Sequence, residues 1–416
     1  MQRVPSAIHP PQPMPRILYF FALCNLVIGS GAFVLGGILQ PVSESLNISL
    51  AAAGQAMTAY ALATAVLAPV LILTTSNWPR KRVMQMALFL FSAGSLVCAL
   101  APGFGWLLLG RVLMGAGAMF TATASALAVT LAVTLVAPAL RGCALAISFL
   151  GLSISYAVGV PLGAWLGFEY GWRVPVWLSA GSGFAALLAA TWLVPLNLPA
   201  SATTFKGFAT AARQPAVLRV WGRTLLYFVA IFSVFTYVGP VLQALNPLNP
   251  LQLSITLALF GAAGVAGTLT GGWAADRFGP IRAMRVQLAL LVAMMGVLPL
   301  TQGSPVATQI ALTLWGIAGF GLMTPQQSRL ASLSPSQAPL LLSLNASMLY
   351  VGTALGAVLS GSLLGSVELH RLGWVGLPFA LLAWLSLLFE RDPAASPGLP
   401  SHHAQSVPCV SPAPPG

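Results

Sequence analysis

The sequence predicts an all-α integral membrane protein with twelve transmembrane helices in two pseudo-symmetric six-helix bundles. Only 6% of the 416 residues are charged and 57% are hydrophobic, and so little charge cannot cover the surface of a water-soluble protein. The charged residues fall in short breaks between apolar stretches of about 20 residues, the length that spans a bilayer as a helix. These stretches run through Gly and Pro without alternating polar residues, which favours helices over a β-barrel.

The apolar stretches form two sets of six, and each set is a predicted bundle. The first set lies near residues 17–40, 51–74, 83–101, 106–132, 143–167 and 174–194. The second set lies near residues 220–243, 251–274, 286–301, 307–327, 341–366 and 375–389.

The breaks and the chain ends set the predicted domain organisation. The widest break separates bundles at 17–194 and 220–389, and we expect residues 195–219 to form a cytoplasmic linker. Residues 1–16 are an expected cytoplasmic tail. Residues 390–416 are rich in Pro, Ser and Ala, so we expect a disordered cytoplasmic tail there.

The net charge of +12 indicates membrane topology rather than nucleic-acid binding. Basic residues gather in alternate breaks, for example in PRKR at 79–82 and in DRFGPIRAMR at 276–285. The breaks between them hold only Arg173 and Arg371. Because excess Lys and Arg mark the cytoplasmic side, both termini are expected in the cytoplasm, which an even number of spans permits.

The residues offer little for catalysis, metal binding or a cofactor. The four cysteines are scattered and have no metal-ligand spacing, so we expect neither a metal nor a cofactor. No phosphate-binding GxxxxGK[ST] loop is present, which argues against direct ATP hydrolysis. The spans contain no recognisable cluster of acids, His or Cys, so a membrane-embedded enzyme is not expected.

Two basic breaks occupy corresponding positions in the halves and are candidate gating loops. The second-half break reads GGWAADRFGPIR, which places an acid and a base at a helix end before a tight Gly-Pro turn. Such a charge cluster can latch one of two conformations, and a plain positive-inside turn is the alternative. The candidate gating residues are Gly272, Asp276, Arg277, Gly279 and Arg282, with Arg80, Lys81 and Arg82 in the first half.

Four motifs in order carry a family resemblance over nearly all of residues 17–389. GGWAADRFGPIR resembles the loop signature of the major facilitator superfamily. LLLGRVLMGAGA at 107–118 resembles its fourth-helix motif, and GVPLGAWLG at 159–167 resembles the fifth-helix motif of antiporters. With GSGAFVLGGILQP in the first helix, the set is similar to the bacterial drug and sugar efflux branch, the arabinose- and chloramphenicol-efflux-like permeases.

Two positions depart from that branch. Ala32 stands where many members have a first-helix glutamate, and the first-half loop lacks the aspartate of the general motif. The acids of this chain lie near span ends or in breaks, so three coupling modes stay open: an unusual coupling group, a proton and substrate sharing a site near Arg111, or transport without protons. The fifth-helix motif residues are Gly159, Pro161 and Gly163; helix packing alone would also explain its glycines.

The resemblance places the transport pathway on helices one, four, seven and ten, between the two halves. Helical spacing places Gly29 on one face with Asn25 and Phe33 of helix one, and Gly115 and Ala118 on one face with Arg111 and Met114 of helix four. The candidates with larger side chains are Asn25, Phe33, Arg111, Met114, Tyr227, Phe235, Trp315 and Met323. Arg111 is the foremost candidate because a cation inside a span is costly unless it faces water or a partner; snorkelling to the interface is the alternative. Hydrogen bonds to a solute or between helices are expected from Gln55, Tyr60, Asn345 and Tyr350.

The resemblance implies a secondary active transporter in the bacterial inner membrane that exports small, mostly apolar molecules by alternating access, with proton antiport. Its expected partners are a small-molecule substrate, protons and the lipid bilayer, without nucleic acid, and the chain is expected to be a monomer. An importer or facilitator of a small metabolite such as a sugar or amino acid is the alternative within this class. A membrane-embedded enzyme or a sensor is the alternative from another class.

Overall fold

The computed structural model describes residues 16–121, 123–124, 127, 147, 150–195, 214–334, 338–388 and 390. Twelve helices in this part of the chain are long and apolar enough to cross a membrane, which confirms the predicted spans. Most of the predicted tails at 1–16 and 390–416 and of the linker at 195–219 lie outside the described residues, as does the region around Cys143.

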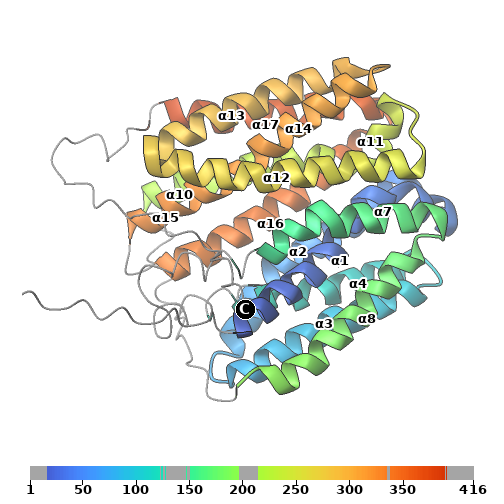
Figure 1. Ribbon diagram of the computed structural model, residues 1–416, viewed down its shortest axis with the longest axis vertical. Coiled ribbons are helices and arrows are strands. Elements are labelled where there is room, and N and C mark those ends of the chain that lie inside the picture. The colour runs from blue at the N-terminus through green and yellow to red at the C-terminus, as the bar shows by residue number, and fades with distance from the viewer. Residues whose placement is uncertain are drawn as a thin grey trace, which may run out of the picture.

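The first six spans build one half of the molecule (Figure 1). They comprise α1 (Arg16–Leu46), α2 (Leu50–Thr74), α3 (Arg80–Leu100), α4 (Phe104–Gly117), the π-helical turn η2 (Ser155–Gly159) with α7 (Val160–Glu169), and α8 (Arg173–Leu193). The first span continues past its predicted end at residue 40. Pro41 lies inside α1, and the backbone of Ile38 is non-helical, so the helix bends there instead of ending.

The second half repeats this plan. It comprises α10 (Pro215–Phe235), α11 (Val238–Leu245), α12 (Pro250–Phe278), α13 (Pro280–Val297) with η3 (Leu298–Thr301), α14 (Pro305–Gly321), α15 (Met323–Leu333), α16 (Ala338–Leu363), η5 (Leu369–Arg371) and α17 (Leu372–Leu388).

The seventh span differs from its predicted range of 220–243 at both ends. It begins at Pro215, inside the segment predicted as a linker, because proline fits the first turn of a helix, where its missing N–H is not needed. It breaks after Phe235 into α10 and α11. The cause is Pro240, which has no N–H to bond the carbonyl of Thr236 one turn earlier.

The turn between α12 and α13 matches its prediction. Gly279 has a φ of 88°, a conformation that glycine adopts without strain, and Pro280 starts the next helix. The predicted ninth span, 286–301, therefore starts earlier, at Pro280.

The two halves pack against each other through α2 with α16, α12 with η2 and α7, and α1 with α11 (Figure 1). Some of these approaches require glycine, since a Cβ on Gly239 would collide with the carbonyl oxygen of Gly37. Tyr237 fills the space beside Gly54 of α2 and Gly361 of α16. The halves are therefore in close backbone contact at the end that carries α11.

Candidate functional site

Arg111 lies near the middle of α4 and points into the first half rather than to a membrane surface. Its side chain is 1% exposed. Nε donates to the carbonyl oxygen of Ala56 at 3.2 Å, Nη1 to Gly31 at 2.9 Å and Nη2 to Ala32 at 2.6 Å. These carbonyls belong to α1 and α2, so the guanidinium joins three helices. The snorkelling alternative is excluded.

Sulfur and an aromatic ring complete the surroundings of this guanidinium. Nη2 lies 3.3 Å from Sδ of Met57, and Nη1 lies 3.8 Å from Sδ of Met114. The guanidinium carbon lies 4.7 Å from the ring centroid of Tyr60, a cation–π contact. All five N–H donors of Arg111 thus have an acceptor, but within the described residues none of those acceptors is a carboxylate.

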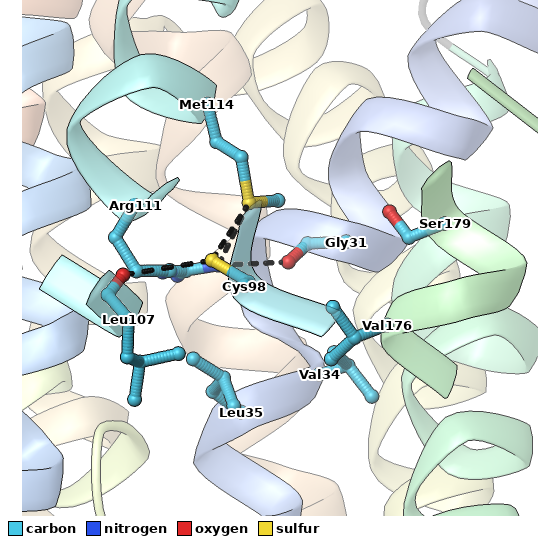
Figure 2. Close-up of a pocket in the computed structure, with 9 residues that line it drawn as sticks. All are labelled: Gly31, Val34, Leu35, Cys98, Leu107, Arg111, Met114, Val176 and Ser179. Carbon is cyan, nitrogen blue, oxygen red and sulfur yellow. Dashed lines mark hydrogen bonds between the residues drawn. The ribbon is translucent and has the colours of Figure 1, made fainter. Parts of the chain in front are cut away.

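A small cavity lies beside Arg111 (Figure 2). In the close-up, Arg111 reaches toward Gly31, while the sulfur atoms of Cys98 and Met114 face each other, 4.0 Å apart. The cavity volume is about 10 Å³, roughly the room that one water requires. The cavity lies within the first half and is too small to hold a substrate.

Aromatic side chains from both halves meet in what we call the central aromatic cluster. Phe33 of α1 stacks on Tyr156 of η2 at a centroid distance of 5.0 Å and lies 6.4 Å from Phe235 of α10. Tyr60 lies 6.2 Å from Tyr350 of α16. The cluster comprises Phe33, Tyr60, Tyr156, Phe232, Phe235, Phe260, Trp315, Phe320 and Tyr350.

The cluster unites some of the predicted pathway residues. Phe33, Phe235 and Trp315 belong to it, and Arg111 adjoins it through Tyr60. Met114 faces Arg111. Tyr227 adjoins the cluster through Phe228, which stacks on Phe232 at a centroid distance of 5.8 Å. Two other candidates lie apart: Met323 is partly buried against the core at the start of α15, and Asn25 is buried two helical turns before Phe33.

Four members of the cluster are missing from the predicted set. Phe232 lies on α10, one turn before Phe235, and was within reach of the same helical spacing. Tyr156, Phe260 and Phe320 come from η2, α12 and α14. Tyr156 and Phe260 lie on spans five and eight, whereas the family resemblance places the pathway on spans one, four, seven and ten. The π-helical turn that places Tyr156 has no sequence signal of its own.

In the described part of the chain, no ion pair joins the candidate gating residues to one another. Within the described residues Asp276 has no ion pair and is exposed, as is Arg282. Arg277 lies over the rings of Trp273 and Phe278, at 5.9 Å and 5.8 Å from their centroids. Gly272 faces open space except for Thr324, at an ordinary contact distance.

The first-half loop and the fifth-helix motif make packing contacts with neighbouring helices. Lys81 donates to the carbonyl oxygen of Thr191 at 2.6 Å, which satisfies the C-terminal end of α8. Arg80 is buried and Arg82 is exposed. Gly159 and Gly163 pack against Ser30 and Val34 of α1. The carbonyl oxygen of Pro161 accepts a hydrogen bond from Ser254 of α12 at 2.9 Å, a bond between the halves.

A second charged cluster, at the end of the molecule that carries α15, was not predicted. Glu390 pairs with Arg223 of α10 and, at 3.0 Å, with Arg329 of α15. Arg285 of α13 donates to the carbonyl oxygens of Leu387 and Glu390. Glu390, predicted as the first residue of a disordered tail, is therefore fixed to three helices.

The electrostatics of Glu390 follow from this pairing. Partial burial of the carboxyl group raises its pKa, but Arg223 and Arg329 outweigh that effect, and the pKa lies below its ordinary value. The group is therefore ionised at neutral pH and is the counter-ion of Arg223 and Arg329.

The sequence matches the family model described as "Major Facilitator Superfamily" over residues 21–338 and 248–413. It is 28% identical over 378 residues to the Bacillus subtilis protein "Uncharacterized MFS-type transporter YbcL", covering 90% of this chain and 96% of that relative. It is 29% identical over 376 residues to the Escherichia coli K12 "Inner membrane transport protein YdhP", covering 87% and 94%.

Solved structures share the fold. A bacterial homolog to the human lysosomal transporter Spinster, in an inward-facing and occupied conformation, superposes with a TM-score of 0.74 at 17% identity, covering 91% of this chain and 97% of that one. The human organic anion transporter MFSD10 superposes with a TM-score of 0.68 at 18% identity, covering 90% and 100%.

Proposed function

This chain belongs to the major facilitator superfamily, and on that premise we propose that it is a secondary transporter that exports small, mostly apolar molecules by alternating access. The membrane it occupies is the bacterial inner membrane, as for the relative YdhP. Both termini face the cytoplasm, in keeping with the distribution of Lys and Arg. The chain acts as a monomer with one small-molecule substrate.

The observation that carries this proposal is the composition of the central aromatic cluster. Its rings come from both halves, so a rocking motion of the halves changes every contact across it. A surface of aromatic rings with few hydrogen-bonding groups suits apolar solutes. It suits a sugar poorly, because a sugar needs many fixed hydrogen bonds.

Proton antiport is the finer part of the proposal, and it has to work without an acid in the interior. In the described part of the chain, the acids are exposed or, for Glu390, paired with arginines. Arg111 is the buried charge nearest to the cluster. We therefore place the coupling of substrate and proton movements at Arg111 and the groups that bind it.

The test is cellular retention of a panel of fluorescent dyes and antibiotics, with and without a protonophore. Cells that express the wild type should retain less dye or antibiotic than cells without the protein. Adding the protonophore, or replacing the wild type by Arg111→Ala, should abolish this difference in retention. Arg219→Ala is the matched control, because Arg219 is an exposed arginine on α10 whose hydrogen bond stays within its own helix. Unchanged retention across the panel, with the protein present in the membrane, would refute export.

One observation favours a second candidate, a facilitator or importer of a small metabolite. Ala32 places only a backbone carbonyl beside Arg111, where the related branch often has a glutamate. Transport without protons is one way in which a carrier that lacks this acid can work. Uptake of a labelled sugar or amino acid down its gradient, unaffected by a protonophore, would establish this function and exclude antiport.

A further inference from the structure

The central aromatic cluster is held together by ring contacts that cross between the halves. Phe33 lies 5.9 Å from Phe232, Tyr156 lies 4.7 Å from Phe320, and Tyr60 lies 6.2 Å from Tyr350. Separation of the halves breaks all of these contacts at once. The rings of each half then lack their partners from the other half. An aromatic solute can take the place of those partners and make the same stacked and edge-to-face contacts.

The charge beside this cluster is positive, and no carboxylate of the described residues pairs with it. The guanidinium of Arg111 contacts Tyr60, a member of the cluster, and only carbonyl oxygens and thioethers bind its N–H groups. Among the described acids, Glu44, Glu169, Asp276 and Glu368 are exposed, and Glu390 is bound by arginines. In a low-dielectric interior the field of Arg111 therefore repels a cation and attracts an anion.

Aromatic cages often bind ammonium groups through cation–π contacts, so the sign of the charge beside the cluster decides which class of ligand it binds. Here the face of Tyr60 is already occupied by Arg111, at 4.7 Å. A cation would lose that face and would also approach an uncompensated positive charge. The cluster thus has the rings of a cation cage without its carboxylate.

A buried hydrogen-bond donor in the cluster also favours a ligand without positive charge. Nε1 of Trp315 has no hydrogen-bond partner within the described residues, although the side chain is only 3% exposed and its ring lies 5.1 Å from Phe260. An indole N–H can only donate, so its partner has to be an acceptor. Carboxylates and carbonyl groups supply one, whereas an ammonium group does not.

We propose that the central aromatic cluster binds aromatic solutes that carry a hydrogen-bond acceptor and no positive charge, and that it rejects cations of the same shape. This substrate class rests on the proposed transport function and specifies its site. The rings supply the affinity, Trp315 binds the acceptor, and Arg111 sets the sign of the charge that is tolerated.

The test uses the full chain in lipid nanodiscs and three probes with one ring system. They are 2-naphthoate, 2-naphthamide and 2-naphthylmethylammonium, with binding measured by isothermal titration calorimetry. The anion and the amide should bind, and the cation should bind at least about tenfold more weakly than the amide. Equal binding of the cation and the amide, or no binding of any probe, would overturn the proposal.

Two substitutions assign the selectivity to its residues. Trp315→Phe keeps one six-membered aromatic ring and removes the N–H donor with the five-membered ring, so naphthoate and naphthamide should bind about tenfold more weakly. Trp273→Phe, at a 57% exposed tryptophan, should leave the binding of all three probes unchanged. Ala32→Glu places a carboxylate beside Arg111. It should reduce the difference in affinity between 2-naphthoate and 2-naphthylmethylammonium. Ala32→Gln is its control, with the same size and no charge, and an equal effect of both would overturn the role of Arg111.

Failure of this proposal is distinguishable from failure of the transport function. Energised export of cationic dyes together with tighter binding of the cationic probe would overturn the substrate class and leave the transporter intact. Absence of any transport in the panel, with the anion and the amide still bound selectively, would overturn export and retain the binding site.

Discussion

In the described part of the chain, each half holds one arginine that is 2% exposed or less, Arg111 and Arg223, and the two are held in opposite ways. Arg111 in the first half is 1% exposed and binds three backbone carbonyls, two thioethers and a tyrosine face. Arg223 in the second half is 2% exposed and pairs with the carboxylate of Glu390, and Nε donates to Ser386 at 3.0 Å. The positive charge of Arg111 is therefore not balanced by a carboxylate of the described residues, whereas that of Arg223 is balanced by Glu390.

We propose that this difference separates a charge used in transport, Arg111, from one that stabilises the fold, Arg223. A buried charge that serves packing alone is stabilised by a counter-ion, as Arg223 is, or is replaced by an apolar side chain. Partial dipoles satisfy the donors of Arg111 but leave a positive field beside the central aromatic cluster. We therefore expect loss of Arg111 to change transport and loss of the Arg223 pair to change stability.

The largest effect is expected from Arg111→Ala and Arg111→Lys. Both should abolish transport at unchanged membrane levels, because an ammonium group has three donors and cannot reproduce the planar five-donor geometry that joins α1, α2 and α4. The measurement is the export rate per molecule of protein in the membrane. Full activity in Arg111→Lys would show that charge alone suffices, and full activity in Arg111→Ala would discard the site.

The next effect is expected from Glu390→Gln, in stability rather than transport. Arg223 would stay buried without a counter-ion, a loss of about 2–3 kcal/mol in the free energy of unfolding, below the full range for deep pairs because Glu390 is 10% exposed. Thermal unfolding in detergent is the measurement. Glu368→Gln is the control, since Glu368 forms its ion pairs while 64% exposed. Equal losses in the two variants would contradict the comparison.

A smaller effect is a pH dependence that only the second-half cluster should show. The pKa of Glu390 is lower in the folded protein than its ordinary value of 4.5. Its stabilising contribution is therefore complete above 4.5 and disappears as the pH falls through the lower folded pKa. The difference in melting temperature between wild type and Glu390→Gln should narrow below that pH. A difference that is constant down to about pH 3 would show that Glu390 does not act through its charge.

The sequence predicts one of these arginines and not the other, for a physical reason. Arg111 interrupts an apolar run, so its cost in a membrane is visible in the sequence. Arg223 lies close to a span end, where positive charge is ordinary, and its partner Glu390 is 167 positions away. Only the folded arrangement of α10, α15 and α17 brings them together.

The aromatic cluster shows the same limit. The twelve spans follow from hydropathy because lipid imposes helices of a fixed length. Phe33, Phe235 and Trp315 follow from helical spacing on the expected spans. Tyr156 does not, because a π-helical turn shifts the register of side chains at Ser155–Gly159.

The smallest effect is expected from Met57→Leu, which tests whether the thioethers matter to Arg111. Sulfur is a weak acceptor, and Sδ of Met57 lies 3.3 Å from Nη2, which also donates to Ala32. Leucine keeps the volume, so the export rate should fall only about twofold to fivefold, with stability changed by less than about 1.5 kcal/mol. Met84→Leu, at a buried methionine of α3, is the matched control and should have the same small effect on stability with no effect on transport. A loss of transport as complete as in Arg111→Ala would mean that the sulfur of Met57 positions the guanidinium. Backbone carbonyls alone would then be insufficient to hold Arg111 in a chain that has Ala32 in place of the first-helix glutamate.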